Sequence, residues 1–371
     1  STPVSSERYC LFSPTGFTPI HRKHRHVWDN PNSIQLSWTS VPLPHRQYQV
    51  INRISRLTPL ISICLPNLNN RPYLRERIQT IIDQTWQNWE LIIVDNHSED
   101  GAWEFFQTLQ DPRIHISQAP RCGMYQNWNN CIELARGEYV YIATSDDTMQ
   151  PDCIETMVHS LECHPECGIA HSNLIVIDEM GNEIKGFYET KCRSALYFRD
   201  LIHRSHIRRA PHDGLLHYYG GTVYVSITQL LIRKALFDRV GLFRNDLGSA
   251  ADFEWEMRAT LEANTVHVPR YLASWRIHNN QATSFSVLET PDSRMRHLNM
   301  SRLAWNHFAE NREKHTTSLP GARQRWETVF RMDAISLQMA KGRNSWAKLL
   351  ILGVNLVTHP LTALHYLYLH L

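Results

Sequence analysis

The sequence predicts an α/β protein whose core is a doubly wound sheet, with an irregular arm before it and a helical extension after it. Short apolar runs alternate with segments in which apolar residues recur at helical spacing. Each run has the compact form of a strand buried on both faces. Acidic residues follow two of these runs directly, and ligands of such sheets bind at the carboxyl ends of the strands.

The first strand is expected at Leu60–Leu65, a compact apolar run closed by Pro66. Apolar residues at helical spacing follow over Arg71–Thr85. A separate turn signal at Gly181-Asn182 indicates a hairpin. The other expected strands are Leu91–Val94, Arg113–Ile116, Tyr139–Ala143, Ile169–Ile177 and Val223–Ile232, and the other expected helices are Gly101–Leu109, Gln126–Ala135, a helix from Pro151 to about Leu161, and Ala251–Ala263.

The composition divides the chain into three parts. Residues 1–57 are rich in Pro, His, Arg and Ser and show no sustained period, so we expect an arm or cap there. Residues 58–288 form the predicted α/β domain, and residues 289–371 read as helical. The last 27 residues are strongly apolar, but Pro360 divides them and no uninterrupted apolar stretch approaches the ~18 residues of a membrane span. Peripheral membrane contact and ordinary burial both remain open for this segment.

Charge and cysteine content narrow the class of protein. With 38 basic and 36 acidic residues the formal net charge is only +2, so we expect no nucleic-acid partner. The basic clusters at His21–His26 and Phe198–His212 are expected to be solvated faces. Eight cysteines without a regular framework favour a reducing compartment, and no signal sequence is visible. We therefore expect a cytoplasmic protein, with peripheral contact to the inner face of a membrane as an addition.

One set of metal-ligating residue types recurs every four positions: His159, Cys163, Cys167 and His171. Zinc is conceivable, but Pro165 and Gly168 would interrupt a continuous helix and no C-x2-C pair is present. We expect a helix end leading into a strand here in preference to a structural zinc site.

Two adjacent carboxylates, Asp146 and Asp147, follow the expected strand Tyr139–Ala143. A buried strand would deliver both negative charges to one point at its carboxyl end. Like charges held side by side raise each other's pKa, and a bound cation relieves that cost. The pair therefore predicts a cation site, and Asp95, which ends another strand, is expected on the same edge of the sheet.

These strand ends resemble glycosyltransferase family 2, a large family of inverting enzymes that have the GT-A fold and use nucleotide-diphosphate sugars. The resemblance extends from about Leu60 to Ser284 and rests on four motifs in the same order. They are PNLNNRPYL (Pro66–Leu74), QTWQNWELIIVDNHSEDG (Gln84–Gly101), GMYQNWNNCIELARGEYVYIATSDD (Gly123–Asp147) and WRIHNNQATS (Trp275–Ser284).

The resemblance implies a set of nucleotide-binding residues. Pro66, Leu68 and Asn69 match the loop after the first strand, which passes under the nucleotide. Asp95 matches the carboxylate that accepts a hydrogen bond from the nucleobase, and this suits the N–H of a uracil or thymine ring. Asn96 stands where many relatives have a second aspartate. A cap on the following helix is the alternative role for Asp95.

The resemblance also implies a metal. Asp146 and Asp147 match the last two positions of the family's acidic motif, which binds Mn²⁺ or Mg²⁺. We expect Asp147 to be the main metal carboxylate and Asp146 to lie nearer the ribose. Thr144 replaces the leading aspartate of the common motif, which puts the metal affinity in doubt. His278 matches a further ligand, with an ordinary loop histidine as the alternative.

Asp252 resembles the family's catalytic base at the start of a helix, although Ala251 stands where many relatives have Glu. Such a base takes the proton from the attacking acceptor hydroxyl. Glu254 is the nearest rival, but it would point about 200° away around a helix that Asp252 opens, and we expect it to be solvated or paired with Arg258. Simple helix capping is the alternative for Asp252.

The resemblance thus implies transfer of a sugar from a UDP- or dTDP-sugar to a hydroxyl of a glycan, a lipid-linked acceptor or a small molecule, with inversion. Two other classes remain open. A nucleotidyltransferase or a sugar-nucleotide hydrolase could use the same residue types, although the absence of glycine from Pro66–Arg71 disfavours the first. A degenerate, non-catalytic nucleotide-sugar-binding module is supported only by Thr144.

Overall fold

The computed structural model describes residues 58–220, 223–248 and 251–278, together with positions 281, 300, 302–304, 306–307, 310 and 352–353. The predicted arm at residues 1–57 lies outside the described residues, and so does nearly all of the predicted helical region at 289–371. The division of the chain into three parts at these boundaries therefore stays a prediction.

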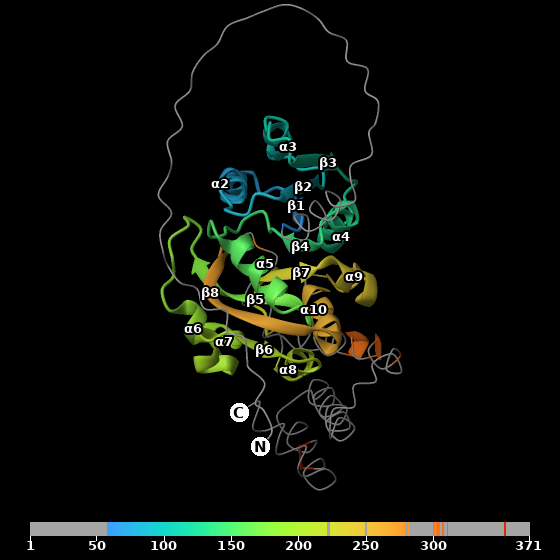
Figure 1. The fold of residues 1–371 in the computed structure, drawn as a ribbon. Coiled ribbons are helices and arrows are strands. Elements are labelled where there is room, and N and C mark those ends of the chain that lie inside the picture. The colour runs from blue at the N-terminus through green and yellow to red at the C-terminus, as the bar shows by residue number, and fades with distance from the viewer. Residues whose placement is uncertain are drawn as a thin grey trace, which may run out of the picture. The chain divides into compact units, whose positions relative to one another are not determined.

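An eight-stranded sheet forms the centre of the described part, in the order β3-β2-β1-β4-β7-β5-β8-β6 (Figure 1). The strands are β1 (Ile61–Asn67), β2 (Trp89–Asp95), β3 (Ile114–Gln118), β4 (Tyr139–Ile142), β5 (Cys167–Ile177), β6 (His206–Arg208), β7 (Leu230–Arg233) and β8 (Asn264–Arg276). β1 to β4 are parallel, β7 is antiparallel to β4 and β5, and β6 is antiparallel to β8. The predicted mixed α/β sheet is confirmed.

Helices cover both faces of this sheet (Figure 1). They are α2 (Arg71–Ile82), α3 (Ala102–Phe106), α4 (Met124–Leu134), α5 (Cys153–Cys163), α6 (Phe187–Lys191), α7 (Arg193–Phe198), α8 (His212–Gly220), α9 (Lys234–Val240) and α10 (Ala251–Glu262). Side chains of α2, α3 and α5 form one core cluster with the sheet, and side chains of α4, α9 and α10 form the other. Alternate residues of each strand therefore face different cores, as a doubly wound sheet requires.

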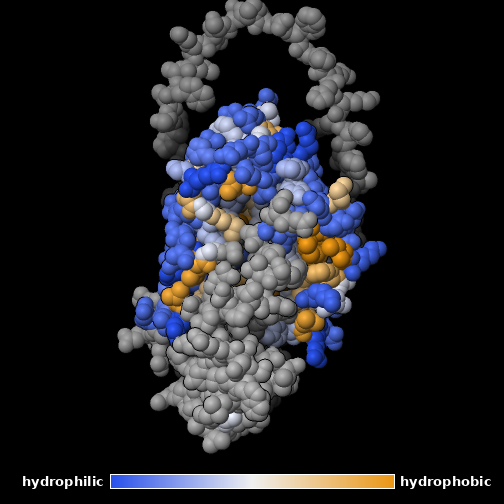
Figure 2. All heavy atoms as spheres, turned by 180° about the vertical axis from the view of Figure 1, so that it is seen from behind, coloured by the Kyte–Doolittle hydropathy of each residue, from blue (hydrophilic) through white to orange (hydrophobic). Residues whose placement is uncertain are grey.

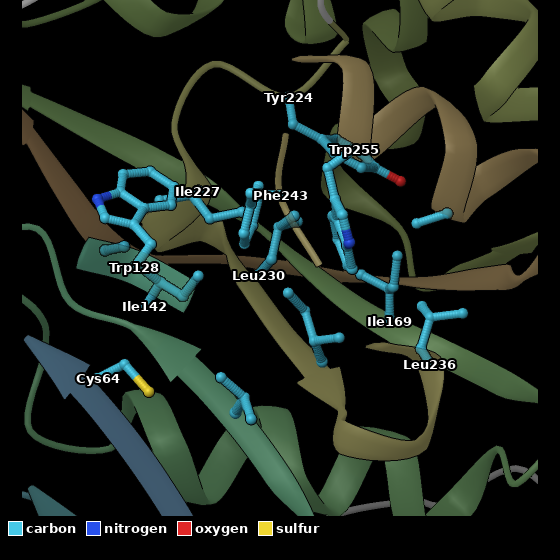
Figure 3. Close-up of a cluster of buried hydrophobic side chains, with 14 of the residues drawn as sticks. Cys64, Trp128, Ile142, Ile169, Tyr224, Ile227, Leu230, Leu236, Phe243 and Trp255 are labelled. Atoms are coloured by element: carbon cyan, nitrogen blue, oxygen red, sulfur yellow. The ribbon is translucent and has the colours of Figure 1, made fainter. Parts of the chain in front are cut away.

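Aromatic rings join α4 to α10 within the second core. Phe243 packs between Trp128 and Trp255, with ring centroids 5.3 Å and 5.1 Å away (Figure 3). Each of these three side chains is at most 5% exposed. Because large aromatic side chains contribute much of a core's stability, this stack fixes the two helices relative to each other.

Two strand predictions need correction. The expected strand Val223–Ile232 is shorter, because a 3-10 helix at Ile227–Gln229 occupies its middle and only Leu230–Arg233 joins the sheet. The 13-residue strand β8 was not predicted at all. Pro269 lies within it, and its register against β5 shifts repeatedly. These irregularities break the strict alternation by which a strand is recognised.

Of two further predictions for this half of the sheet, one is confirmed and the other is wrong at one residue. α5 ends at Cys163 and β5 begins at Cys167, so the predicted helix end leading into a strand is confirmed. The expected solvated face at Phe198–His212 is wrong for Arg208, which is buried and pairs with Asp213 at 2.7 Å. A buried arginine of this kind needs its carboxylate partner, and that partner lies beyond the basic cluster.

The described surface is mostly hydrophilic, with apolar side chains gathered at separate places on the face shown in Figure 2. Within the described residues, no helix is long and apolar enough to cross a membrane. The apolar segment at 345–371 lies almost wholly outside those residues, so its predicted contact with a membrane surface stays a prediction.

Histidines on β5 and β8 form a buried network under the second half of the sheet. His171 Nδ1 lies 3.2 Å from His267 Nδ1, His267 Nε2 lies 3.0 Å from the Ile202 carbonyl, and Gln229 Nε2 lies 3.2 Å from His171 Nε2. One hydrogen on each ring satisfies these three contacts, although Arg208 Nη2 also lies 3.3 Å from His171 Nδ1 and competes for that nitrogen. Burial lowers the pKa of His267 to about 3 and that of His171 well below its ordinary value, and the nearby Arg208 guanidinium lowers both further.

We expect the folded state to lose stability as the pH falls below about 6.5, the ordinary histidine pKa. The unfolded chain then binds protons that the folded His267 does not, which costs about 1–2 kcal/mol between pH 7 and pH 5 for this one group. Urea unfolding at both pH values should show a smaller pH-dependent loss for His267→Gln than for the wild type. Equal losses in the two proteins would contradict the assignment.

Gly137 allows β4 to approach β1 closely. A Cβ at this position would lie 2.6 Å from the Leu60 carbonyl oxygen and 2.7 Å from the Ser62 nitrogen. The Gly137 N–H also donates to Ser62 Oγ at 2.8 Å, and this hydrogen bond holds the segment just before β4 against β1. Because the obstructing atoms belong to the backbone, a larger residue cannot be accommodated by a change of rotamer.

Gly137→Ala should therefore destabilise the protein by about 1–3 kcal/mol, because it overpacks a backbone contact in the sheet. Thermal unfolding followed by circular dichroism would measure this effect. A melting temperature equal to that of the wild type would show that β1 and β4 can separate at no cost.

Candidate active site

The carboxyl ends of β1, β2 and β4 bring three loops to one edge of the sheet. Asn70 Nδ2 donates to Ser145 Oγ at 2.6 Å, joining the loop after β1 to the loop after β4. The Asn69 N–H donates to Ser98 Oγ at 2.9 Å, joining the same loop to the one after β2. Parallel strands end on the same side of a sheet, so the predicted site residues of these loops are gathered as expected.

Asp95 lies at this edge, but its carboxylate is already occupied. Asn67 Nδ2 and Ser98 Oγ donate to Oδ1 at 2.9 and 2.6 Å, and the Ser98 N–H and Gln118 Nε2 donate to Oδ2 at 3.0 and 3.3 Å. The residue is 0% exposed. The carboxylate therefore shapes the loop after β2, and a direct contact with a nucleobase would require one of these donors to leave.

The other predicted nucleotide-binding residues differ in accessibility. Pro66 is buried within β1, whereas Leu68 is 41% exposed. Asn69 has a positive φ of 54° and accepts the Glu99 N–H on its side chain. Asn96 is buried, and its Oδ1 accepts the Cys122 N–H at 3.1 Å, so its amide NH₂ is the group left for a ligand.

Asp147 is the more enclosed member of the acidic pair. The Arg276 N–H donates to its Oδ1 at 2.8 Å, and the Thr144 hydroxyl donates to its Oδ2. It is only 2% exposed. Burial and the adjacent Asp146 raise the pKa of the Asp147 carboxyl well above its usual range, against the effect of these two hydrogen bonds. Thr144, which replaces an aspartate of the family motif, is thus a direct partner of the pair.

Asp146 is more accessible, with 20% of its side chain exposed, and His278 Nε2 lies 2.9 Å from its Oδ2. This contact raises the pKa of His278. The His278 ring also packs against Tyr73 at 5.1 Å. The structure therefore places His278 beside Asp146 of the acidic pair, and its expected role as a metal ligand stays a prediction.

A short antiparallel segment explains how residues from β8 reach the end of β4. Met149 forms a β-bridge with Ala273, the Gln150 N–H donates to Leu272 O, and the Ser274 N–H donates to Thr148 O. The chain after the acidic pair therefore runs along β8. Residues that follow Ser274 on β8 consequently come to lie beside the residues that precede Thr148.

Two arginines of the site were missed by sequence reasoning. The Arg276 guanidinium donates to the Asp146 carbonyl at 2.7 Å and pairs with Glu76 at 2.6 Å. Arg77 is fully buried in α2, has no hydrogen-bond partner for its guanidinium among the described residues, and acts to lower the pKa of Asp147. Arg276 lay within the motif WRIHNNQATS, so its place two residues before His278 was the available signal.

Asp252 lies in the first turn of α10, as predicted. Its Oδ1 accepts hydrogen bonds from the Tyr125 hydroxyl at 2.8 Å and from the Phe253 N–H at 3.0 Å. Within the described part of the chain, Oδ2 has no hydrogen-bond donor. Burial of the carboxyl raises the pKa of Asp252 to about 6, although the hydrogen bonds from Tyr125, from the Phe253 N–H and from its own backbone N–H act to lower it. One oxygen is thus held, and the other is free to accept a proton.

Glu254 is disfavoured as a rival base. Arg258 Nε donates to its Oε1 and Arg258 Nη2 donates to its Oε2, both at 2.9 Å. The predicted pairing with Arg258 is confirmed, but the pair is buried instead of solvated. Both oxygens of this buried carboxylate are held by one guanidinium, which disfavours Glu254 as a proton acceptor.

Helix α4 connects the loop after β2 to the segment before Asp252. At its start, Cys122 N–H donates to Asn96, and Tyr125 donates to Asp252. One turn further, Asn129 exchanges two hydrogen bonds with the backbone of Phe243, at 2.8 and 3.0 Å. The contacts to Asn96 and Asp252 therefore come from positions only three residues apart.

The acidic pair has the chemistry of a cation site, although no group of three or more His, Cys, Asp or Glu side chains with metal-site geometry occurs among the described residues. The observation in favour is the buried Asp147 carboxyl, whose pKa is raised by burial and by Asp146. A divalent cation would stabilise the ionised form of both carboxylates. Asp146, Asp147 and His278 together offer the oxygen and nitrogen donors that such an ion takes.

Several curated proteins are similar to part of this chain. An uncharacterized protein, MT1568 of Mycobacterium tuberculosis, is 28% identical over 62% of this chain and 71% of its own length. Glycosyltransferase GlyG of Streptococcus pneumoniae is 30% identical over 50% of this chain. The chain spans 60% of the length of GlyG and 24% of another relative, y4gI of Sinorhizobium fredii.

A solved structure of Staphylococcus aureus TarS in complex with UDP covers 76% of this chain and 80% of its own, with 15% identity and a TM-score of 0.48. The sequence model of the family described as Glycosyl transferase family 2 matches residues 62–235, which include β1, the acidic pair and β7. This part of the chain is therefore similar to glycosyltransferase family 2, which indicates a glycosyltransferase.

Proposed function

We propose that the protein transfers a sugar from a nucleotide-diphosphate sugar, with UDP- and dTDP-sugars as the first candidates, to a hydroxyl acceptor, with inversion at the anomeric carbon. Asp252 is the general base in this proposal. Asp146, Asp147 and His278 are the residues for a divalent cation, Mn²⁺ or Mg²⁺. The loops that carry Leu68, Asn69 and Asn96 form the nucleotide side of the site, with Asp95 holding them in shape.

The observation that carries this proposal is the hydrogen bond between Tyr125 and Asp252. It ties the candidate base to the end of α4 that contacts Asn96. A direct displacement needs the base and the nucleotide site at a fixed spacing, because the base must reach the acceptor hydroxyl, which attacks the sugar from the side opposite the leaving diphosphate. A helix cap would not require a buried tyrosine as its second partner.

The cation, when bound, would neutralise the negative charge of the departing diphosphate. The chain's own residues supply the rest. Arg276 and Thr144 hold Asp147 in place, His278 orients Asp146, and Asp252 takes the proton of the acceptor hydroxyl. Since a carboxylate is needed for this step, activity should decline as the pH falls through about 6, the raised pKa of Asp252.

Release of free nucleoside diphosphate tests the function. The full chain is incubated with Mn²⁺ and each of UDP-glucose, UDP-galactose, UDP-N-acetylglucosamine and dTDP-glucose, with and without hydroxyl acceptors. A transferase releases the diphosphate faster with an acceptor. Release of the nucleoside monophosphate, or a rate independent of acceptor, would instead indicate a hydrolase or nucleotidyltransferase, and binding without turnover would indicate a non-catalytic module.

Asp252→Asn should reduce transfer by about 10²-fold or more while donor binding survives, because the amide keeps the size of the side chain but cannot take a proton. Asp238→Asn, an exposed position on α9, is the matched control and should behave like the wild type. Steady-state kinetics and donor calorimetry measure the two effects. Normal transfer by Asp252→Asn, or a product with the donor's anomeric configuration, would refute the mechanism.

Asp146→Asn and Asp147→Asn should each raise the Mn²⁺ concentration for half-maximal activity by about tenfold or more, because each removes a negative charge from the site. Calorimetry with Mn²⁺ and UDP should show the same weakening without turnover. If only Asp146→Asn changed the metal dependence, Asp147 would be a structural partner of Arg276 and Thr144, and its expected role as the main metal carboxylate would be wrong.

A further inference from the structure

The Tyr125 hydroxyl makes a hydrogen bond directly to the candidate base. It donates to Asp252 Oδ1 at 2.8 Å, and it is the one side-chain donor to Asp252 within the described residues. Tyr125 is 3% exposed and follows Gly123 at the start of α4. A buried tyrosine hydroxyl must have a partner, and here that partner is the candidate base.

We propose that Tyr125 is a positioning residue of the transfer reaction: its hydroxyl fixes Oδ1 of Asp252 so that Oδ2 meets the hydroxyl of the acceptor. This rests on the proposed function, in which Asp252 is the base. Tyr125 does not itself touch the reacting atoms. It acts by restricting the carboxylate to one orientation, and misplacement of a catalytic group is costly.

The proton balance of the step follows from this arrangement. The acceptor O–H gives its proton to Oδ2 of Asp252, and the acceptor oxygen forms a bond to the anomeric carbon. The bond from that carbon to the diphosphate oxygen breaks, and the diphosphate leaves with the electron pair. Tyr125 keeps its proton throughout, because burial and the Asp252 charge raise its pKa well above the ordinary tyrosine value.

The tyrosine ring and the tyrosine hydroxyl have separable roles. The ring packs against Trp128 with centroids 5.0 Å apart and against Phe243 at 6.1 Å. Helix α4 is also held independently, through Asn127, which donates to the Val94 carbonyl, and through Asn129, which pairs with the Phe243 backbone. Removing the hydroxyl alone therefore leaves the packing of α4 in place.

The described residues around Asp252 offer little positive charge, so the hydrogen bond from the Tyr125 hydroxyl contributes to the stability of the ionised Asp252 carboxylate. Glu256 lies one turn further along α10, is buried, and raises the pKa of Tyr125. Within the described residues, Asp252 forms no ion pair. The Tyr125 hydroxyl is thus the side-chain group that stabilises the carboxylate against burial, beside the backbone N–H groups of Phe253 and of Asp252 itself, and all three lower its pKa.

The test is Tyr125→Phe in the full chain, with the donor of the panel above that supports the highest rate. We expect kcat at neutral pH to fall about tenfold, the donor KM to change by less than about twofold, and the acid limb of kcat/KM to move to higher pH. Tyr188→Phe is the control. Tyr188 is 2% exposed in the same core, and its hydroxyl accepts a hydrogen bond from Ser194.

A second measurement does not depend on turnover. A ¹³C NMR titration of aspartate carboxyls, with Asp252→Asn for the assignment, should show a higher pKa for Asp252 in Tyr125→Phe than in the wild type. An unchanged titration and an unchanged acid limb in a Tyr125→Phe protein that melts like the wild type would overturn the proposal. So would a loss of rate that Tyr188→Phe matches without any shift of the limb.

The double variant separates this proposal from the proposed function. If Asp252→Asn is inactive, Tyr125→Phe should cause little additional loss on that background, because the hydroxyl then has no base to hold. If Asp252→Asn is inactive and Tyr125→Phe is normal, only the role of Tyr125 falls. If Asp252→Asn transfers sugar normally, the assignment of the base falls and this proposal falls with it.

Discussion

The site depends on how β8 and the residues after it hold the two carboxylates that follow β4. Asp146 and Asp147 would repel each other at the edge of the sheet if nothing opposed their charges. The Arg276 N–H and guanidinium hold Asp147 and the Asp146 backbone, and His278 lies against the Asp146 carboxylate. These partners come from the end of a strand that begins more than a hundred residues later and from the segment just after it. Because the chain after the acidic pair runs antiparallel along β8, this long strand holds the loop after β4 in place and brings the partners of Asp146 and Asp147 to it.

Helix α4 holds the loop after β2, on the proposed nucleotide side of the site, in a fixed position relative to the candidate base Asp252. The Cys122 N–H, two residues before the helix, donates to Asn96, and Tyr125 in its first turn donates to Asp252. Its inner face packs on the sheet, and Phe243 locks it to α10 through the aromatic stack. A transferase must hold two substrates in line, and a rigid helix in a dense core is a better support for that geometry than a loop alone. The buried polar atoms that this requires are largely satisfied by backbone partners.

The regular half of the fold could be predicted because its signals are local. The runs that became β1, β2 and β4 are apolar on both faces, and the helices between them repeat at helical spacing. The later half could not be predicted as well. β8 contains Pro269 and shifts register against β5, and the segment before β7 turns into a 3-10 helix. Arg208 looked like part of a solvated basic cluster, but Asp213 makes its burial favourable.

The sequence by itself determined the resemblance to glycosyltransferase family 2, the strands that carry Asp95 and the acidic pair, and the residue types at the strand ends, because each of these is a pattern within a short stretch of chain. Only the tertiary structure decided which groups meet. It enclosed Asp95 among protein donors, set His278 against Asp146 instead of Asp147, paired Glu254 with Arg258, and brought Tyr125 to Asp252. A hydrogen bond between residues 127 positions apart depends on the packing of two helices, and no local pattern specifies that packing.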